Sequence, residues 1–128
     1  MPTLHQRARG RVAYEAGKAA EASVAARYSA QGNRVLHTRW RGTSGEIDLI
    51  VEQSDGYVFV EVKKARSFAE AAQRLGARQV SRLCNAGLEF VAQSPLGMAA
   101  SMRFDVAVVD ALGECRIIEN AFGEGGAY

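Results

Sequence analysis

Two short apolar segments carry the residues whose types and spacing could do chemistry. Residues 46–52 (EIDLIVE) and 57–63 (YVFVEVK) predict β-strands, because both are rich in valine, isoleucine or phenylalanine. Residues 53–56, which end in Asp-Gly, predict a turn that joins the strands into a hairpin. This turn sets a register that places Asp48 opposite Glu61 and Glu46 opposite Lys63, with Cβ atoms about 5 Å apart in each pair.

Two carboxylates that face each other in a sheet repel unless a positive charge lies between or beside them. A divalent cation meets this need, because Mg²⁺ binds through one or two carboxylates together with phosphate oxygens and water. Lys63, beside the pair, could orient or deprotonate a water molecule or stabilise a pentavalent phosphorane. Asp48, Glu61 and Lys63 thus indicate metal-assisted phosphodiester hydrolysis.

A second interpretation of the same charges is structural. Lys63 could pair with Glu46 and, diagonally, with Asp48, which would give a surface ladder of salt bridges that contributes little stability. The apolar strands favour a central position in the sheet, where these charges would lie near the core. Glu21 falls on the apolar face of the preceding predicted helix, where a carboxylate needs a partner. That partner is either the same metal ion or an N–H group or arginine, and the sequence leaves both open.

The elements around the hairpin predict an α/β fold, a mixed sheet of about five strands flanked by helices. We expect a basic flexible arm over residues 1–11, a single domain over 12–122 and a glycine-rich tail over 123–128. Helical periodicity predicts helices over 12–31 and, with an interruption near Gly76, over 69–92. The remaining predicted strands cover residues 34–40, 102–109 and 115–119. On the first of the late strands, Arg103 and Asp105 share a face and could form an ion pair.

Composition narrows the class of protein. The 128 residues are 48% hydrophobic and 23% charged, which are globular proportions and exclude intrinsic disorder. No apolar run approaches the ~20 residues of a membrane span, and the polar, basic start predicts no secretory signal. Cys84 and Cys115 are expected as reduced thiols of a cytoplasmic protein rather than as a disulfide, and no zinc motif is present.

Charge is distributed unevenly along the chain. Residues 1–82 hold 14 of the 16 Lys and Arg and 8 of the 14 Asp and Glu, whereas residues 83–128 carry a net charge of −4. Such asymmetry is typical of a protein that binds a polyanion, although chance clustering on a solvated surface gives the same pattern.

The sequence resembles the YraN family of uncharacterised bacterial proteins. The resemblance covers roughly residues 14–122 and is carried by four segments: 45–50 (GEIDLI), 58–63 (VFVEVK), 103–106 (RFDV) and 120–122 (NAF). That family is similar to Holliday-junction resolvases and to the restriction-endonuclease-like PD-(D/E)xK nucleases. The resemblance therefore implies their three-layer core, and it departs from the family pattern at Ala20, Ser44 and Ala65.

The resemblance also implies roles for individual residues. Asp48 and Glu61 match the two acidic positions of the motif, Lys63 matches its lysine, and Glu21 matches a glutamate on the first helix of resolvase-like members. These four residues are the predicted catalytic set, with Asp48, Glu61 and Glu21 as ligands of Mg²⁺ or Mn²⁺. Arg78 or Gln79 falls where many members place a basic or polar residue on the next helix.

Basic residues provide candidate contacts to nucleic acid, since phosphate contacts need only positive charge and reach. The predicted contact residues are Arg39, Arg41, Lys64, Arg66, Arg78 and Gln79, and Arg7, Arg9, Arg11 and Arg34 are further basic groups. Trp40 could stack on an unpaired base or simply pack against the core.

The sequence thus predicts a divalent-metal-dependent nuclease that acts on DNA, including branched or flapped DNA. A non-catalytic nucleic-acid-binding module with the same fold is the alternative, and a protein-interaction domain is a third hypothesis. A homodimer, as in resolvases, is compatible with the sequence but is not indicated by it.

Overall fold

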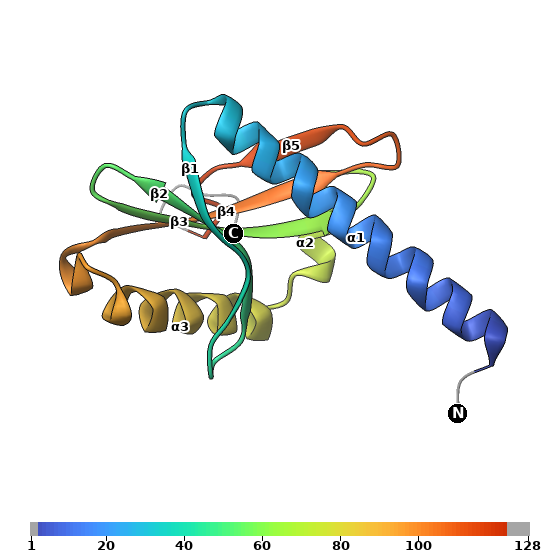
Figure 1. Cartoon of the computed structure of the whole chain (residues 1–128), viewed down its shortest axis with the longest axis horizontal. Coiled ribbons are helices and arrows are strands. Elements are labelled where there is room, and N and C mark those ends of the chain that lie inside the picture. Colours follow the sequence, from blue (N-terminus) through green and yellow to red (C-terminus); the bar gives the residue numbers. More distant parts are fainter. Residues whose placement is uncertain (1–2, 123–128) are drawn as a thin grey trace.

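The predicted hairpin lies inside a five-stranded sheet. It consists of β2 (Glu46–Gln53) and β3 (Gly56–Lys64), which pair antiparallel in the predicted register from Gln53 with Gly56 to Leu49 with Val60. The computed structural model describes residues 3–122, and the other strands are β1 (Arg34–Arg41), β4 (Ser101–Val109) and β5 (Cys115–Ile118). The strands follow one another in chain order across the sheet, and only β3 and β4 are parallel (Figure 1).

A parallel pair requires a crossover, and two helices supply it. The helices α2 (Phe68–Arg74) and α3 (Ala77–Gln93), followed by the short 3₁₀ helix η1 (Gly97–Ala99), connect β3 to β4. The predicted interruption near Gly76 is confirmed, because the buried Leu75 ends α2 and Gly76 is the N-cap of α3. The mixed sheet with helices on both faces confirms the predicted fold class (Figure 1).

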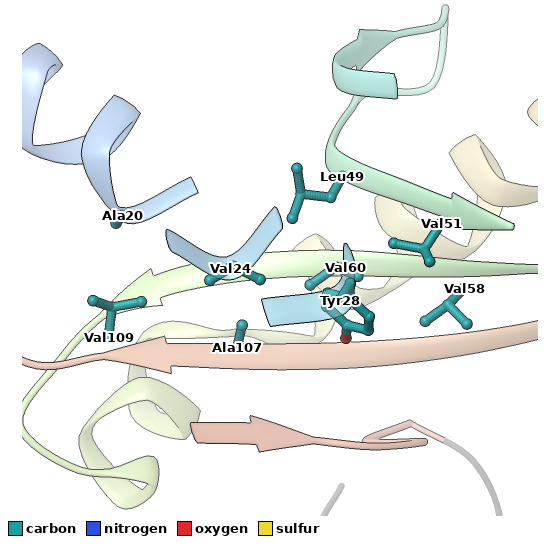
Figure 2. Packing of buried hydrophobic residues seen from close by; sticks show 9 residues of the cluster. All are labelled: Ala20, Val24, Tyr28, Leu49, Val51, Val58, Val60, Ala107 and Val109. Carbon is teal, nitrogen blue, oxygen red and sulfur yellow. The ribbon is translucent and has the colours of Figure 1, made fainter. Parts of the chain in front are cut away.

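One face of the sheet is covered by α1 (Leu4–Ala30), which contributes Ala20, Val24 and Tyr28. Figure 2 shows these side chains against valine, leucine and alanine side chains of β2, β3 and β4. Small residues on the helix let it lie close to the strands, and burial of these apolar side chains stabilises the contact. The packing fixes the rotation of α1 about its axis, and with it the direction in which Glu21 points.

The opposite face is covered by α2 and α3. The ring of Phe90 on α3 makes edge contacts with Tyr57 and Phe59 of β3 and with Trp40 of β1. Trp40 is therefore part of the packing, which was one of its two interpretations. Leu83, Ala86 and Val91 complete the buried side of α3.

One boundary differs from the prediction. The helix expected from residue 12 begins at Leu4, because Thr3 and Gln6 form a capping box in which each side chain accepts the other's backbone N–H. Residues 4–11, expected as a flexible arm, are therefore helical. The glycine-rich tail over 123–128 lies outside the described residues. Cys84 and Cys115 are both free thiols, as expected.

Candidate active site at the end of the hairpin

Asp48 lies where the regular ladder between β2 and β3 ends. Its Oδ2 atom accepts a hydrogen bond of 2.8 Å from the backbone N–H of Val62, two residues beyond the last regular pair on β3. This bond anchors the carboxylate beside Glu61, in agreement with the predicted register. The strict alternation expected for β2 fails here, because Ile47 packs with Ile50 and Phe90 on the α3 side rather than with Leu49.

Glu61 is the second carboxylate, and its exposed fraction is only 8%. Its Oε1 atom lies 3.3 Å from Lys63 Nζ and accepts a hydrogen bond of 3.1 Å from Gln79 Nε2. Lys63 Nζ in turn donates to Gln79 Oε1 over 3.4 Å. Gln79, in the first turn of α3, therefore hydrogen-bonds both the Glu61 carboxylate and the Lys63 ammonium. Its role is to position these two side chains.

The two carboxylates oppose each other's ionisation. Burial, followed by the charge of Asp48, raises the pKa of Glu61 to about 7, although the nearby Lys63 ammonium acts in the other direction. Burial is also the main reason why the pKa of Asp48 is raised, and the bond from Val62 N–H partly offsets it. Two buried acids with raised pKa values are a feature of functional sites rather than of surface salt-bridge ladders.

The predicted ladder of salt bridges is not what the hairpin forms. Glu46 pairs with the exposed Arg41 at 3.2 Å, and Lys63 pairs with Glu61. Glu46 therefore lies beside the site without being held by Lys63.

Glu21 reaches the same region from α1. Its Oε2 atom lies 2.7 Å from Arg39 Nε, so its partner is an arginine, one of the two options left open by the sequence. The Glu21 charge contributes to the raised pKa of Asp48, which places the two carboxylates in one electrostatic neighbourhood. Within residues 3–122, however, no three side chains of Asp, Glu, His or Cys assemble as a metal-binding group.

An open pocket of about 450 Å³ lies over the two carboxylates. It is lined by Gly45, Glu46, Asp48, Glu61, Gln79, Arg82 and Leu83. Arg82 was not among the predicted residues. The signal was present, because residues three apart on a helix share a face and Gln79 was already a candidate.

The loop at the mouth of the pocket is held by Glu89 of α3. Its carboxylate accepts hydrogen bonds from the backbone N–H groups of Thr43 and Ser44 and from Thr43 Oγ1, at 2.9, 3.2 and 3.1 Å. These bonds fix the β1–β2 connection, from which Gly45 and Glu46 enter the pocket.

The predicted nucleic-acid contacts do not converge on one spot. Gln79 lines the pocket and Arg39 contacts Glu21, whereas Arg66 pairs with Glu70 and lines a separate cavity of about 670 Å³. Arg41, Lys64 and Arg78 are exposed on the surface.

The donor set fits a hard divalent cation. Asp48 and Glu61 offer only oxygen ligands, and Mg²⁺ commonly takes one or two carboxylates and completes its shell with water and phosphate oxygens. A cation placed between them would relieve their mutual repulsion, and these two carboxylates are the protein ligands that it would have.

Comparison with known proteins assigns the chain to a family. The Uncharacterised protein family UPF0102 matches residues 20–109. The chain belongs to this family. This confirms the resemblance inferred from the sequence, since YraN proteins are UPF0102 proteins.

Relatives match over nearly the full chain. A UPF0102 protein of Ruegeria pomeroyi is 53% identical over 91% of this chain and 95% of its own length. A second UPF0102 protein, from Roseobacter denitrificans, is 51% identical over 98% of both chains.

Within residues 3–122, no helix combines the length and the apolar character needed to cross a bilayer.

Proposed function

We propose that this UPF0102 protein is a divalent-metal-dependent nuclease that hydrolyses phosphodiester bonds of DNA, including branched or flapped DNA. The observation that carries the proposal is the pair of carboxylates, the half-buried Asp48 and the buried Glu61, which share a pocket and have raised pKa values. Such a pair is electrostatically unfavourable without a cation, so its presence is best explained by the cation that it would bind.

Each residue of the site has a distinct part in the proposal. Asp48 and Glu61 would hold Mg²⁺ or Mn²⁺, which when bound polarises a phosphoryl oxygen and makes a coordinated water more acidic. Lys63, held against Glu61 and Gln79, would orient the attacking water or stabilise negative charge on the phosphorus-bound oxygens. Glu21 would join the cation from α1. Arg82 would receive a neighbouring phosphate at the rim of the pocket.

Exposed basic residues support a nucleic-acid substrate, for which we propose DNA, through phosphate contacts. Arg41, Lys64, Arg66 and Arg78 are exposed basic residues on elements that flank or follow the hairpin. We also propose a cytoplasmic location, which the two free thiols support.

Cleavage by matched variants tests the proposal. Labelled junction, flap, duplex and single-stranded DNA, and RNA, are incubated with Mg²⁺ or Mn²⁺. Asp48→Asn keeps the oxygen that accepts from Val62 N–H but loses the charge, so we expect cleavage to fall by about 100-fold or more while the fold persists. Glu52→Gln is the matched control, because Glu52 is an exposed carboxylate on the same strand, and it should cleave normally.

The same variants separate the nuclease from its alternative. DNA binding that weakens steeply with salt, without cleavage under any metal, would favour the non-catalytic binding module. Equal cleavage by Asp48→Asn and wild type would contradict the assignment of Asp48. Size-exclusion chromatography of the same samples shows whether the chain forms a homodimer.

A further inference from the structure

The ion pair between Glu21 and Arg39 does not line the pocket, but the charge of Glu21 acts on Asp48. The bond of 2.7 Å joins residues from α1 and β1, and the exposed fractions of the two side chains are 16% and 34%. Glu21 is thus paired with a guanidinium, whereas Asp48 accepts from the Val62 N–H and Glu61 from Gln79.

The backbone of Arg39 is held in an unusual conformation. Its φ angle is 53°, which lies in the left-handed region that arginine rarely adopts. The regular pairs of β1 and β2 join Thr38 to Leu49 and Trp40 to Ile47, so Arg39 and Asp48 are the residues between them. The irregular backbone therefore occurs at the register position that faces Asp48.

The position of Arg39 brings two kinds of cation into competition. A divalent cation bound between Asp48 and Glu61 would lie in the neighbourhood of Glu21, whose charge acts on Asp48. A guanidinium and a divalent cation repel each other, and the carboxylate of Glu21 interacts more strongly with the doubly charged ion. A guanidinium that loses a carboxylate binds a phosphate with the same fork of donors.

We propose that Arg39 is a built-in counter-ion that a divalent cation displaces from Glu21, and that the released guanidinium then binds a phosphate of the nucleic acid. The inference rests on the proposed metal site at Asp48 and Glu61. It adds a specific consequence: metal binding and nucleic-acid binding strengthen each other, and Arg39 carries the coupling.

A purely structural ion pair is the competing explanation. In that case Arg39 would only join α1 to β1, and its loss would alter stability without altering metal affinity. The attachment of α1 does not depend on this pair alone, because Tyr28 donates a hydrogen bond to Asp105 and α1 is also held by the apolar cluster. Variants at Arg39 should therefore fold.

Mn²⁺ binding, measured by the electron-spin-resonance signal of free Mn²⁺, tests the inference without any need for turnover. Arg39→Asn removes the guanidinium and suits a positive φ, so it isolates the charge from the backbone. We expect Arg39→Asn to bind Mn²⁺ about tenfold more tightly than wild type, within the usual range of coupling between sites. When Glu21→Gln is already present, the added substitution Arg39→Asn should not change the Mn²⁺ affinity further. Arg39→Gly, which also accepts this backbone, repeats the test if the asparagine variant misfolds.

A second measurement tests the coupling. A hydrolysis-resistant phosphorothioate duplex should tighten Mn²⁺ binding by wild type, and this gain should be smaller in Arg39→Asn, in which only the direct contact between cation and phosphate remains. Equal Mn²⁺ affinity of wild type and both Arg39 variants would overturn the inference alone, provided that Asp48→Asn abolishes binding. Absence of any Asp48-dependent Mn²⁺ binding, with and without the duplex, would overturn the proposed metal site as well.

Discussion

At the residue scale, the protonation of Glu61 links the site to pH. The fold raises the pKa of Glu61 from its ordinary value of 4.5 to about 7. Burial is the main cause, and the charge of Asp48 is the second. The folded state therefore binds more protons than the unfolded state between these values, and stability must fall as pH rises through this window. The raised pKa of Asp48 changes stability with pH in the same direction.

We therefore expect the melting temperature of the metal-free protein to decrease from about pH 5 to about pH 8. Glu61→Gln carries no titrating group at this position and should lose most of that decrease, whereas Glu52→Gln should keep it. Thermal unfolding followed by circular dichroism across this range gives the answer. A slope that is identical in wild type and Glu61→Gln would show that Glu61 is already ionised at low pH.

The site residues that could be predicted were those on regular strands. Alternation and turn length are sufficient to bring Asp48 and Glu61 together, and the ladder follows the predicted register up to Leu49 and Val60. The partner of Glu21 could not be predicted, because Arg39 approaches through a left-handed backbone that leaves no signature in the sequence. Strand alternation alone also misses Ile47, which it would place with Leu49 but which packs with Ile50 on the α3 side.

At the element scale, the contact between α1 and β4 depends on one buried carboxylate. Asp105 is fully buried, and it accepts hydrogen bonds from Tyr28 Oη at 2.7 Å, from Arg103 Nε and Nη2 at 2.9 Å each, and from the backbone N–H of Asn120 at 3.0 Å. The expected ion pair between Arg103 and Asp105 is confirmed. The network joins the end of α1, the middle of β4 and the segment after β5.

Substitutions at Asp105 and at Tyr28 should destabilise the fold by different amounts. Asp105→Ala leaves a guanidinium, a hydroxyl and an N–H without their acceptor, and we expect a loss of about 3–5 kcal/mol. Tyr28→Phe removes one hydrogen bond to a charged group and should cost about 1.5–3 kcal/mol. Urea denaturation measures both, and Glu52→Ala, which removes an exposed carboxylate of β2, is the control. A neutral Tyr28→Phe would show that Arg103 and the Asn120 N–H satisfy Asp105 without the hydroxyl.

Elements were predicted where their limits have a local cause. The break between α2 and α3 follows from Gly76, and the strands follow from their apolar runs. The start of α1 was placed too late because residues 4–11 have no apolar periodicity, and the capping box at Thr3 was overlooked. Leu88 was expected on the apolar face of α3, but 44% of it is exposed, since the buried face runs through Leu83, Ala86 and Phe90.

At the scale of the whole molecule, α1 extends well beyond the sheet (Figure 1). Among the residues of α1 whose side chains are described, Ala20 is the first buried one. Ala20 lies sixteen positions after Leu4, which is about 24 Å along the helix axis, the length of roughly 7 base pairs of duplex. Arg7, Arg9 and Arg11 lie on this part, and its first turn has no acidic residue to offset the positive helix end.

We therefore expect the projecting part of α1 to contact duplex phosphates beside the site. Replacing Arg7, Arg9 and Arg11 together by Gln should weaken binding of long duplexes and lower the slope of log affinity against log salt by about 2–3, because about 0.9 counterions are released per phosphate contact. Duplexes too short to reach beyond the pocket should bind the wild type and the triple variant with the same affinity. Arg116→Gln, a charge loss in the acidic half of the chain, should leave the slope unchanged. Fluorescence anisotropy at several salt concentrations measures these slopes. An unaltered slope in the triple variant would instead assign the helix to another partner, such as a second copy of the chain. Size-exclusion chromatography would reveal that second copy.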